Sequence, residues 1–558
     1  MPVSDDAAQI FCSKIHSFTV SCVPISFQPM TIQGKNIIGY SLSAENTRSF
    51  KSFVPASGTE LPEQFYCATP GEVNRAMELA QKAFIPYAQV SAEKRAEFLM
   101  AITEEILAAG DALLERASLE TGLPIARLQG ERARTINQLT QFAELIREGS
   151  WAEASIDTAI PDRSPIPKPD IRKKLIPIGP VIVFGSSNFP FAYSVAGVDT
   201  GPALAAGNPV IVKAHPAHPG VCDLTAQAIV AAAKKTGMPD GVFSMLYDDG
   251  YEVGSALVKH SSSKAVGFTG SIRGGMALHK LAQERDEPIS VFAEMGSVNP
   301  IVVLPEYLKN NAAQLAKTLA GSVTLGAGQF CTNPGLVFIT NTEGLDLFEE
   351  VYKEEIQKTA SATMLTAGIC NHFFKLREEV FSQQDVDPFA VSNVTSDLQT
   401  QSQASVARVS GKSFISNPKL HEEVFGPFSL LVVCTNTEEI NEAISHLKGQ
   451  LTASLMADEH EASQNAVLIQ SMANISGRFI MNGVPTGVEV CPSMHHGGPF
   501  PSATDARFTS VGRHSILRFV RPQSFQDWPD ALLPVELKNA NPLGIFRLVN
   551  NEVTRKEI

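Results

Sequence analysis

Apolar residues recur three and four positions apart over residues 70–148, a spacing typical of amphipathic helices. The segments 72–84, 92–110 and 126–149 each follow it, which places their apolar side chains on one helix face. The next stretch, AIPDRSPIPKPDIRKK (159–174), has too many prolines for a helix or a central strand. It predicts an exposed ribbon or linker and a boundary in the chain.

From residue 181 onward, short apolar runs alternate with amphipathic segments. Unbroken runs of β-branched residues separated by helices are typical of a parallel sheet that is covered on both faces. Such a Rossmann-like sheet binds ligands beyond the carboxyl ends of its strands. A second series of the same kind follows, so the fold class is α/β with two sheets. The runs are VIVFG (181–185), PVIVK (209–213), VFSML (242–246), KAVGFTG (264–270), ISVFAEMG (289–296), NPIVVLP (299–305), GLVFIT (335–340), FSLLVVC (428–434), LTASLMA (451–457) and GRFIMNG (477–483).

Composition narrows the class of protein. A chain of 558 residues is too long to fold around a single hydrophobic core, so we expect more than one domain. Its composition, with 44% hydrophobic and 18% charged residues, indicates a globular protein. No apolar run approaches the ~18–20 residues that span a bilayer, so we expect no membrane crossing. A net charge of -13 argues against nucleic acid as a partner. Residues 1–29 lack the pattern of a secretory signal, and we expect a disordered extension there, with Met30 as an alternative start.

The cysteines indicate the redox compartment. They are scattered without CxxC or zinc spacing, which predicts reduced thiols, a cytoplasmic protein and no metal site. They are Cys12, Cys22, Cys67, Cys222, Cys331, Cys370, Cys434 and Cys491.

One of these cysteines is a candidate nucleophile. Cys331 lies in LGAGQFCTNPG, between a Gly-rich turn and a proline. A loop of this kind leaves sulfur and backbone N–H groups open to substrate, and a thiolate there would be a strong nucleophile. The alternative is an ordinary buried thiol.

Two further residues could act with it. Glu294 ends the strand ISVFA, where α/β enzymes keep catalytic groups, and could serve as a general base. Asn188 follows the strand VIVFG and could donate its amide N–H to an oxyanion. A surface carboxylate and a simple turn former are the alternatives.

Other turns could bind a phosphorylated ligand. Gly270 and Ser271 join a strand to a helix whose N-terminus could hold a phosphate, and Lys213 ends a strand at the same edge. Glu423 and Phe425 lie on the turn EEVFGPF. Each feature alone is weak evidence, because Gly turns and solvated lysines are common.

Taken together and in this order, these motifs resemble the aldehyde dehydrogenase superfamily from about Met30 to the C-terminus. The resemblance implies that Cys331 is the nucleophile, Glu294 the general base, and Asn188 with the Cys331 backbone N–H the oxyanion hole. It further implies cofactor contacts: Lys213 to the adenosine ribose, Ser271 to the pyrophosphate, and Glu423 with Phe425 to the nicotinamide ribose and ring.

The resemblance also implies a domain organisation. Residues 30–153 and 177–293 would form the cofactor-binding domain, and residues 294–507 the catalytic domain. Residues 154–176 and 508–558 would form a small β oligomerisation arm and a C-terminal tail, giving a homodimer or homotetramer.

One departure from the family pattern concerns cofactor choice. The family often has Lys-Pro-x-Glu, whose Glu binds the ribose hydroxyls and would repel a 2′-phosphate. Here Pro216 stands at that Glu position, and His215 lies beside Lys213. We therefore expect a preference for NADP, with NAD as the alternative.

A finer resemblance concerns the substrate. Residues 184–220 and the loop NGVPTGVEVCPSMHHGGPFPSATDARFTSVG resemble 2,5-dioxovalerate (α-ketoglutaric semialdehyde) dehydrogenases. This implies oxidation of 2,5-dioxovalerate to 2-oxoglutarate. Arg478, Arg507 and the pair His495–His496 are candidates, by residue type alone, to bind the far carboxylate.

Three other hypotheses stay open. The substrate could be another semialdehyde or an aliphatic aldehyde, or the chain could be a non-catalytic binding protein on this fold. A thiol hydrolase is disfavoured, because no Cys–His pair can be identified from the sequence.

Overall fold

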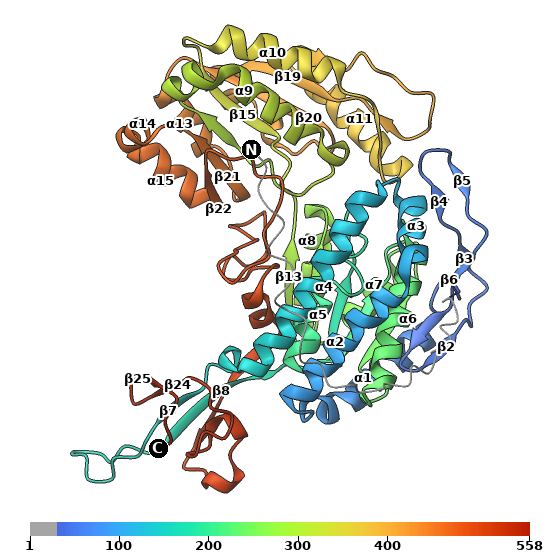
Figure 1. The fold of residues 1–558 in the computed structure, drawn as a ribbon, viewed down its shortest axis with the longest axis vertical. Coiled ribbons are helices and arrows are strands. Elements are labelled where there is room, and N and C mark those ends of the chain that lie inside the picture. The colour runs from blue at the N-terminus through green and yellow to red at the C-terminus, as the bar shows by residue number, and fades with distance from the viewer. Residues whose placement is uncertain (1–30) are drawn as a thin grey trace, which may run out of the picture.

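The computed structural model describes residues 31–558, and Figure 1 shows them as two α/β bodies with a thin arm. The predicted extension 1–29, together with Cys12 and Cys22, lies outside the described residues. The predicted α/β class is confirmed by two seven-stranded sheets of largely parallel strands. Within residues 31–558, no helix is long and apolar enough to cross a membrane.

The first sheet has the strand order β13-β12-β9-β10-β11-β1-β2. The five strands predicted from apolar runs are parallel, and a hairpin near the N-terminus, which the sequence pattern did not reveal, adds two antiparallel strands beside β11. The chain builds the sheet outward from β9 in one direction and then in the other, so the strand order reverses at β9. The strands are β9 (Val181–Phe184), β10 (Val210–Lys213), β11 (Phe243–Leu246), β12 (Ala265–Thr269), β13 (Ser290–Glu294), β1 (Asn36–Ile38) and β2 (Ser41–Ser43).

Helices cover both faces of this sheet, which explains the unbroken apolar strands. Successive residues of a strand point to opposite faces, so Val181 and Val183 pack into one apolar cluster and Ile182 into another. Residues of α2, α4 and α6 fill the first cluster, and residues of α1, α7 and α8 contribute to the second. The covering helices are α1 (Pro70–Ala88), α2 (Ala92–Ala108), α4 (Ile125–Glu148), α6 (Pro219–Lys235), α7 (Glu252–Lys259) and α8 (Ile272–Gln283).

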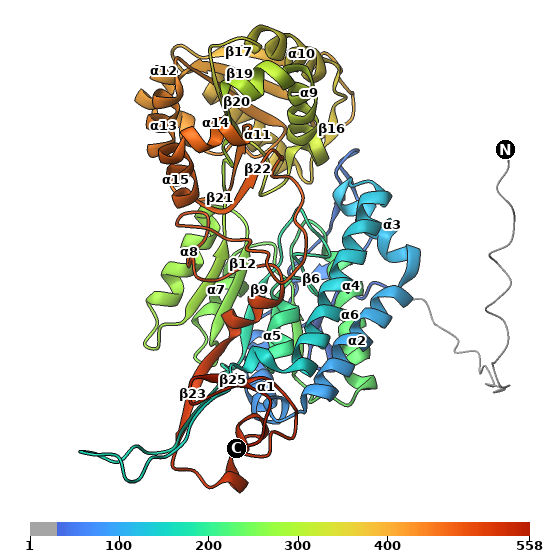
Figure 2. The same ribbon diagram turned by 60° about the vertical axis from the view of Figure 1, so that its left-hand side comes forward.

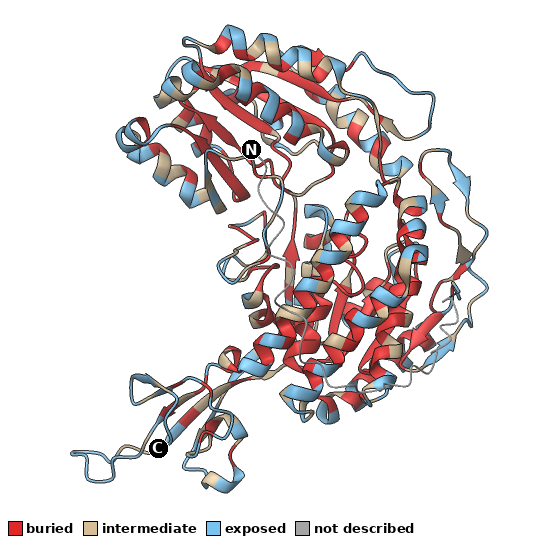
Figure 3. Cartoon of the chain, viewed as in Figure 1, coloured by how far each residue is buried: buried red, intermediate tan, exposed pale blue. Residues whose placement is uncertain are grey.

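The second sheet forms the upper body in Figure 1 and has the order β17-β19-β20-β15-β14-β21-β22. All of its strands are parallel except β17, which runs antiparallel to β19. Four helices pack their buried sides against this sheet, as the colours of Figure 3 show. They are α9 (Pro305–Thr324), α10 (Leu345–Lys358), α13 (Thr437–Ser445) and α15 (Ala466–Ile475). The strands are β14 (Ile301–Val303), β15 (Leu336–Thr340), β17 (Asp387–Val391), β19 (Ser405–Ser410), β20 (Phe428–Cys434), β21 (Gln450–Met456) and β22 (Ser476–Met481).

A third, five-stranded sheet builds the arm. Its order is β23-β8-β7-β24-β25, and β23 and β8 run side by side from the body into the arm (Figure 2). Three of its five strands come from the range 508–558, which was assigned to the arm and the C-terminal tail. The strands are β7 (Ser155–Asp157), β8 (Ile171–Pro177), β23 (Val520–Gln526), β24 (Arg547–Val549) and β25 (Glu552–Thr554). The domain bounds themselves remain a prediction.

Candidate active site

The carboxyl ends of the parallel strands in the first sheet gather the residues singled out from the sequence. Glu294 is the last residue of β13 and lies level with Thr269 at the end of β12, just before Gly270. Lys213 is the last residue of β10, level with Phe184 of β9. Because the strand order reverses at β9, this edge is where a doubly wound sheet opens a crevice for a ligand.

The cysteine loop reaches this edge through an unusual backbone. After α9, the residues Gly326, Ala327 and Gly328 all have positive φ, between 56° and 63°. A Cβ atom at Gly328 would lie 2.1 Å from the carbonyl oxygen of Gly426. Only glycine permits this approach, so the loop before Cys331 and the Gly-Pro turn after Phe425 touch through their backbones.

Asn299 holds the cysteine loop in place. Its Nδ2 donates to the carbonyl oxygens of Cys331 and Asn333, both at 2.9 Å, and its Oδ1 accepts from Thr452 Oγ1 at 2.8 Å. The side chain is fully buried. Sequence reasoning attached no role to the segment MGSVNP, although a polar residue between two apolar strands was a usable signal.

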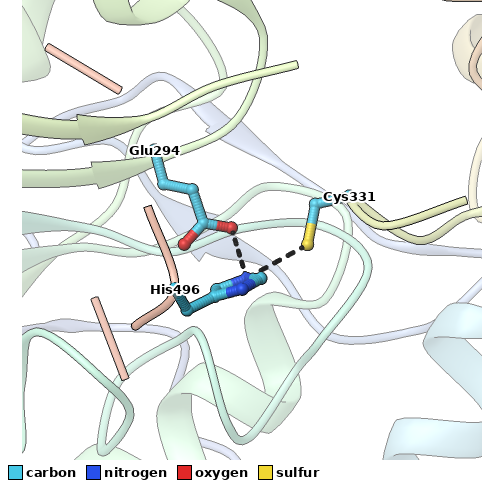
Figure 4. A group of neighbouring side chains, drawn as sticks. All are labelled: Glu294, Cys331 and His496. Carbon is cyan, nitrogen blue, oxygen red and sulfur yellow. Dashed lines mark hydrogen bonds and ion pairs between the residues drawn. The ribbon is translucent and has the colours of Figure 1, made fainter. Parts of the chain in front are cut away.

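The neighbouring side chains of Glu294, Cys331 and His496 form the centre of the site (Figure 4). Cys331 Sγ lies 3.5 Å from His496 Nε2, and the same nitrogen lies 3.0 Å from Glu294 Oε1. Ser510 Oγ donates to the other carboxylate oxygen of Glu294. This Cys–His contact could not be identified from the sequence, since His496 comes from an irregular loop that runs beside the end of β13.

Burial and charge act in opposite directions on this group. Burial alone would raise the pKa of Glu294, but His496 and the hydrogen bonds from His496 and Ser510 outweigh it and leave that pKa below its ordinary value. Burial and the nearby charge of Glu294 raise the pKa of the Cys331 thiol well above its ordinary value. The carboxylate is thus held ionised, while the thiol needs a proton acceptor before it can react.

Asn188 lies next to the cysteine loop. Its side-chain Nδ2 donates to the carbonyl oxygen of Gln329 at 3.0 Å, and Arg127 donates to its backbone oxygen at 3.0 Å. An amide nitrogen carries two hydrogens, so this bond uses one of them. The second hydrogen has no acceptor among the described residues, and its use in an oxyanion hole stays a prediction.

The turn between β12 and α8 suits a phosphate. Ser271 is the N-cap of α8, and its Oγ accepts from the N–H of Gly274 at 3.2 Å. The first N–H groups of this helix have no partner within the helix, and they attract an anion. Gly270 donates its own N–H to the carbonyl oxygen of Glu294 at 3.0 Å, which ties the turn to the catalytic strand.

The structure changes the charge argument made for His215. The ring stacks on His218 with centroids 5.3 Å apart, and its Nδ1 accepts from the N–H of Ala217 at 3.1 Å. Burial, His218 and Lys213 hold the pKa of His215 well below its ordinary value, so the imidazole is neutral and adds no positive charge. Lys213 donates from Nζ to the carbonyl oxygen of Asp248 at 2.6 Å, and burial lowers its pKa.

Glu423 and Phe425 line a small pocket with Ser297 and Gly328. A Cβ atom at Gly296 would lie 2.3 Å from Glu423 Oε2, so glycine there leaves room for the carboxylate. Burial raises the pKa of Glu423 to about 7. The pocket reaches the cysteine loop at Gly328 and Asn333, and the contact of Glu423 and Phe425 with a nicotinamide ribose stays a prediction.

The residues predicted as candidates for binding a distant substrate carboxylate differ in exposure and in their contacts. The Arg507 side chain is 81% exposed and pairs with Asp505, and His496 is engaged with Glu294 and Cys331. Arg478 of β22 and the half-buried His495 remain as candidates. The Arg478 guanidinium donates to the carbonyl oxygens of Gly487 and Pro485, and its charge interacts with Cys331.

The sequence analysis missed a second arginine. Arg134 of α4 lies over the ring of Tyr193 at 5.6 Å and donates to its hydroxyl at 3.4 Å. The Tyr193 ring in turn meets the ring of His496 at 6.3 Å. The Nε atoms of Arg134 and Arg478 are buried and have no partner among the described residues. Helical periodicity does not indicate that Arg134 lies near the site, because an arginine on an amphipathic helix normally faces solvent.

Comparison with known proteins gives a consistent picture. A sequence model described as "Aldehyde dehydrogenase family" matches residues 42–366. An alpha-ketoglutaric semialdehyde dehydrogenase 2 from Azospirillum brasilense is 46% identical over 522 residues, which are 93% of this chain and 99% of that protein. An alpha-ketoglutaric semialdehyde dehydrogenase from Acinetobacter baylyi is 41% identical over 523 residues, 94% of this chain and 99% of that protein.

Solved structures share the fold. A betaine aldehyde dehydrogenase from Staphylococcus aureus in complex with NAD+ superposes with a TM-score of 0.76 at 18% identity, covering 89% of this chain and 98% of that one. A 3,6-anhydro-L-galactose dehydrogenase in complex with NAP gives a TM-score of 0.75 at 20% identity, covering 88% of this chain and 99% of that one.

Proposed function

Because this chain belongs to the aldehyde dehydrogenase family, we propose that it oxidises 2,5-dioxovalerate to 2-oxoglutarate, with Cys331 as nucleophile and NADP as preferred cofactor. The observation that carries the proposal is the meeting of Cys331 and Glu294 at the carboxyl edge of the first sheet, beside Asn188. The two relatives named for alpha-ketoglutaric semialdehyde, each covered over 99% of its length, support the substrate.

The chain's own groups account for the first half of the reaction. The Cys331 thiolate adds to the aldehyde carbon, and the carbonyl oxygen becomes an alkoxide. The free N–H of Asn188 and the backbone N–H of Cys331 stabilise that charge. Losing one such donor typically slows a reaction by ~10²–10³.

The second half of the reaction, hydrolysis of the thioester, needs a base. When bound, the nicotinamide cofactor supplies the hydride acceptor, and a thioester on Cys331 remains. Glu294 then takes a proton from water, which attacks the thioester and releases the carboxylic acid and the thiolate. The lowered pKa of Glu294 keeps it ionised and ready for this step.

Two arginines near Cys331 fit a substrate that carries a carboxylate at the end distant from its aldehyde group. Arg134 and Arg478 carry positive charge close to Cys331, and each has a buried Nε without a described partner. A buried donor without a partner costs free energy that a bound carboxylate would recover. We assign the far carboxylate of 2,5-dioxovalerate to these two residues.

The preference for NADP rests on Pro216, which removes the carboxylate that would repel a 2′-phosphate. Lys213 at the end of β10 would be the positive group near this position, whereas His215 offers at most a neutral hydrogen-bond partner. Ser271 and the N-terminus of α8 would hold the pyrophosphate.

The arm supports assembly into a homodimer or homotetramer. Its outer strands β23 and β25 have free edges within the described chain, and large apolar side chains on the arm are exposed. They include Ile166, Trp528, Leu532 and Val553. A reducing compartment such as the cytoplasm suits a free catalytic thiol.

Steady-state kinetics test the proposal. The purified full chain is assayed with 2,5-dioxovalerate, succinic semialdehyde and pentanal, each with NADP and with NAD. We expect the highest kcat/KM for 2,5-dioxovalerate with NADP, and no oxidation by Cys331→Ala. Cys491→Ala, which removes another partly exposed thiol, serves as the control and should keep the wild-type rate. A higher kcat/KM for either other aldehyde would refute the substrate assignment.

A further inference from the structure

His496 is placed where it can exchange a proton with the nucleophile. Its Nε2 lies 3.5 Å from Cys331 Sγ and 3.0 Å from Glu294 Oε1, and its side chain is fully buried. The backbone fixes the ring position: the N–H of His496 donates to Thr509 Oγ1 at 2.8 Å, and its carbonyl oxygen accepts from the N–H of Ser510 at 2.8 Å.

The contact with Glu294 decides where a proton must lie. An unprotonated nitrogen 3.0 Å from an ionised carboxylate would be repulsive, so the contact with Oε1 favours a hydrogen on Nε2. That same N–H lies within reach of Cys331 Sγ. A thiolate is the form of the sulfur that such a donor stabilises best.

The thiol needs this help. Burial and the charge of Glu294 both raise the pKa of Cys331, so without a positive partner the sulfur would stay protonated and unreactive. Among the described residues, His496 is the imidazole in contact with that sulfur.

We propose that His496 is a catalytic residue that takes the proton of Cys331, so that the resting site holds a thiolate, an imidazolium and the Glu294 carboxylate. The inference rests on the proposed role of Cys331 as nucleophile. Before the transfer the imidazole is the neutral tautomer with its hydrogen on Nδ1. In the transfer, the S–H bond breaks, its electron pair stays on sulfur, and the new N–H bond forms at Nε2. The carboxylate is unchanged, and the net charge of the three groups stays the same.

This arrangement divides the work between two groups. Since His496 holds the thiol proton, Glu294 does not have to accept it and stays ionised for the later attack by water. The imidazolium lies beside the sulfur again when the thioester breaks and the thiolate leaves. A neighbouring imidazole is an established means of activating a cysteine thiol in enzymes.

Other charged and titratable groups face this centre and influence its pH profile. Tyr193 packs against the His496 ring, Arg134 favours the thiolate, and Glu423 opposes it. Arg478 of β22 interacts with Cys331, and His495 with His496. The two arginines favour the thiolate and Glu423 disfavours it, so the profile belongs to the group rather than to one residue.

Alkylation of Cys331 by iodoacetamide in the enzyme without cofactor or aldehyde tests the proposal directly. The rate is followed by mass spectrometry from pH 5.5 to 9, with the partly exposed Cys491 in the same samples as internal control. An ordinary thiol reacts about a hundredfold more slowly at pH 6 than at pH 8. We expect the alkylation rate of Cys331 to fall less than about tenfold over this range, and less than the rate of Cys491 in the same samples. A Cys331 profile that parallels Cys491 overturns the proposal, and this comparison needs no variant.

A matched pair of variants separates proton transfer from positioning. His496→Gln keeps a hydrogen-bond donor but cannot hold a proton, and His514→Gln changes an exposed histidine elsewhere. We expect at least tenfold slower alkylation of Cys331 at pH 7 in His496→Gln, an ordinary pH profile, and partial rescue of His496→Gly by added imidazole. Wild-type rates in His496→Gln overturn the proposal. Failure to oxidise 2,5-dioxovalerate would refute the proposed substrate without changing these alkylation rates.

Discussion

The side-chain amide of Asn299 donates to the carbonyl oxygen of Cys331 at 2.9 Å, so the segment that follows the predicted base also holds the loop that carries the predicted nucleophile. Glu294 is the last residue of β13 and Asn299 lies in the segment between β13 and β14, and the side chains of both lie close to Cys331. The relative position of the two catalytic groups therefore depends on a buried hydrogen-bond network.

Asn299→Ala should weaken both stability and acylation. It leaves the carbonyl oxygens of Cys331 and Asn333 without their donor, at a cost of about 1–3 kcal/mol. A loop displaced by 1 Å can slow the reaction by up to ~10². Urea unfolding and the rate of the NADPH burst measure the two effects. Asn137→Ala, an exposed asparagine on α4, is the control; equal effects in both variants would contradict this role.

Glu294→Gln should separate the two halves of the reaction. Because Glu294 acts on water after hydride transfer, a burst of NADPH close to one equivalent is expected, followed by turnover at least ~10² slower. Rapid mixing with excess substrate measures burst and steady state in one trace. The exposed Glu287→Gln should behave as wild type. A lost burst would show that the carboxylate is already needed for acylation.

Glu423→Gln should change how stability depends on pH. The pKa of Glu423 is raised to about 7 in the folded protein, so the stability linked to its protonated form is present below its ordinary pKa and is lost as pH rises through 7. The variant cannot ionise. We expect its Tm to exceed that of wild type by roughly 2–4 °C at pH 8 and to match it near pH 5. The exposed neighbour Glu422→Gln should give a difference that is the same at both pH values.

Arg478→Met and Arg134→Met should alter substrate choice rather than chemistry. Each removes a positive charge near the sulfur, so KM for 2,5-dioxovalerate should rise at least tenfold, about 1.4 kcal/mol. KM for pentanal, which has no far carboxylate, should change less than about threefold. The exposed Arg521→Met in the arm should leave both values unchanged. Equal losses for both aldehydes would argue for a purely structural role.

Pro216→Glu should move cofactor preference from NADP toward NAD. A carboxylate at this position would repel a 2′-phosphate, and a net repulsion of about 1.4 kcal/mol is tenfold in affinity. Replacing proline also frees φ at the turn, so Pro216→Gln is the matched control without charge. The ratio of kcat/KM for the two cofactors is the quantity to compare. If wild type prefers NAD, or if both variants give the same ratio, the phosphate is recognised elsewhere.

The sequence by itself determined the parts of this protein that local chemistry governs. Unbroken β-branched runs between amphipathic segments can only be satisfied by a sheet covered on both faces, and the strands at 181–184, 210–213 and 265–269 confirm this prediction. The strand end at Glu294 and the glycine-rich turn before Cys331 also follow from local pattern. The sequence therefore singled out both groups before their distance was known.

Only the tertiary structure decided which distant residues complete the site. His496 is separated from Cys331 by 165 positions and lies in an irregular loop without periodicity, so no local pattern could place it. The loop is held beside β13 by the bridge between Glu294 and Ala503 and by the N–H of Met295 donating to Ser502. Likewise Arg134 belongs to an amphipathic helix, and only the packing of α4 against Tyr193 turns it inward. Such contacts depend on the path of the whole chain, because loop closure and packing, rather than residue spacing, set their geometry.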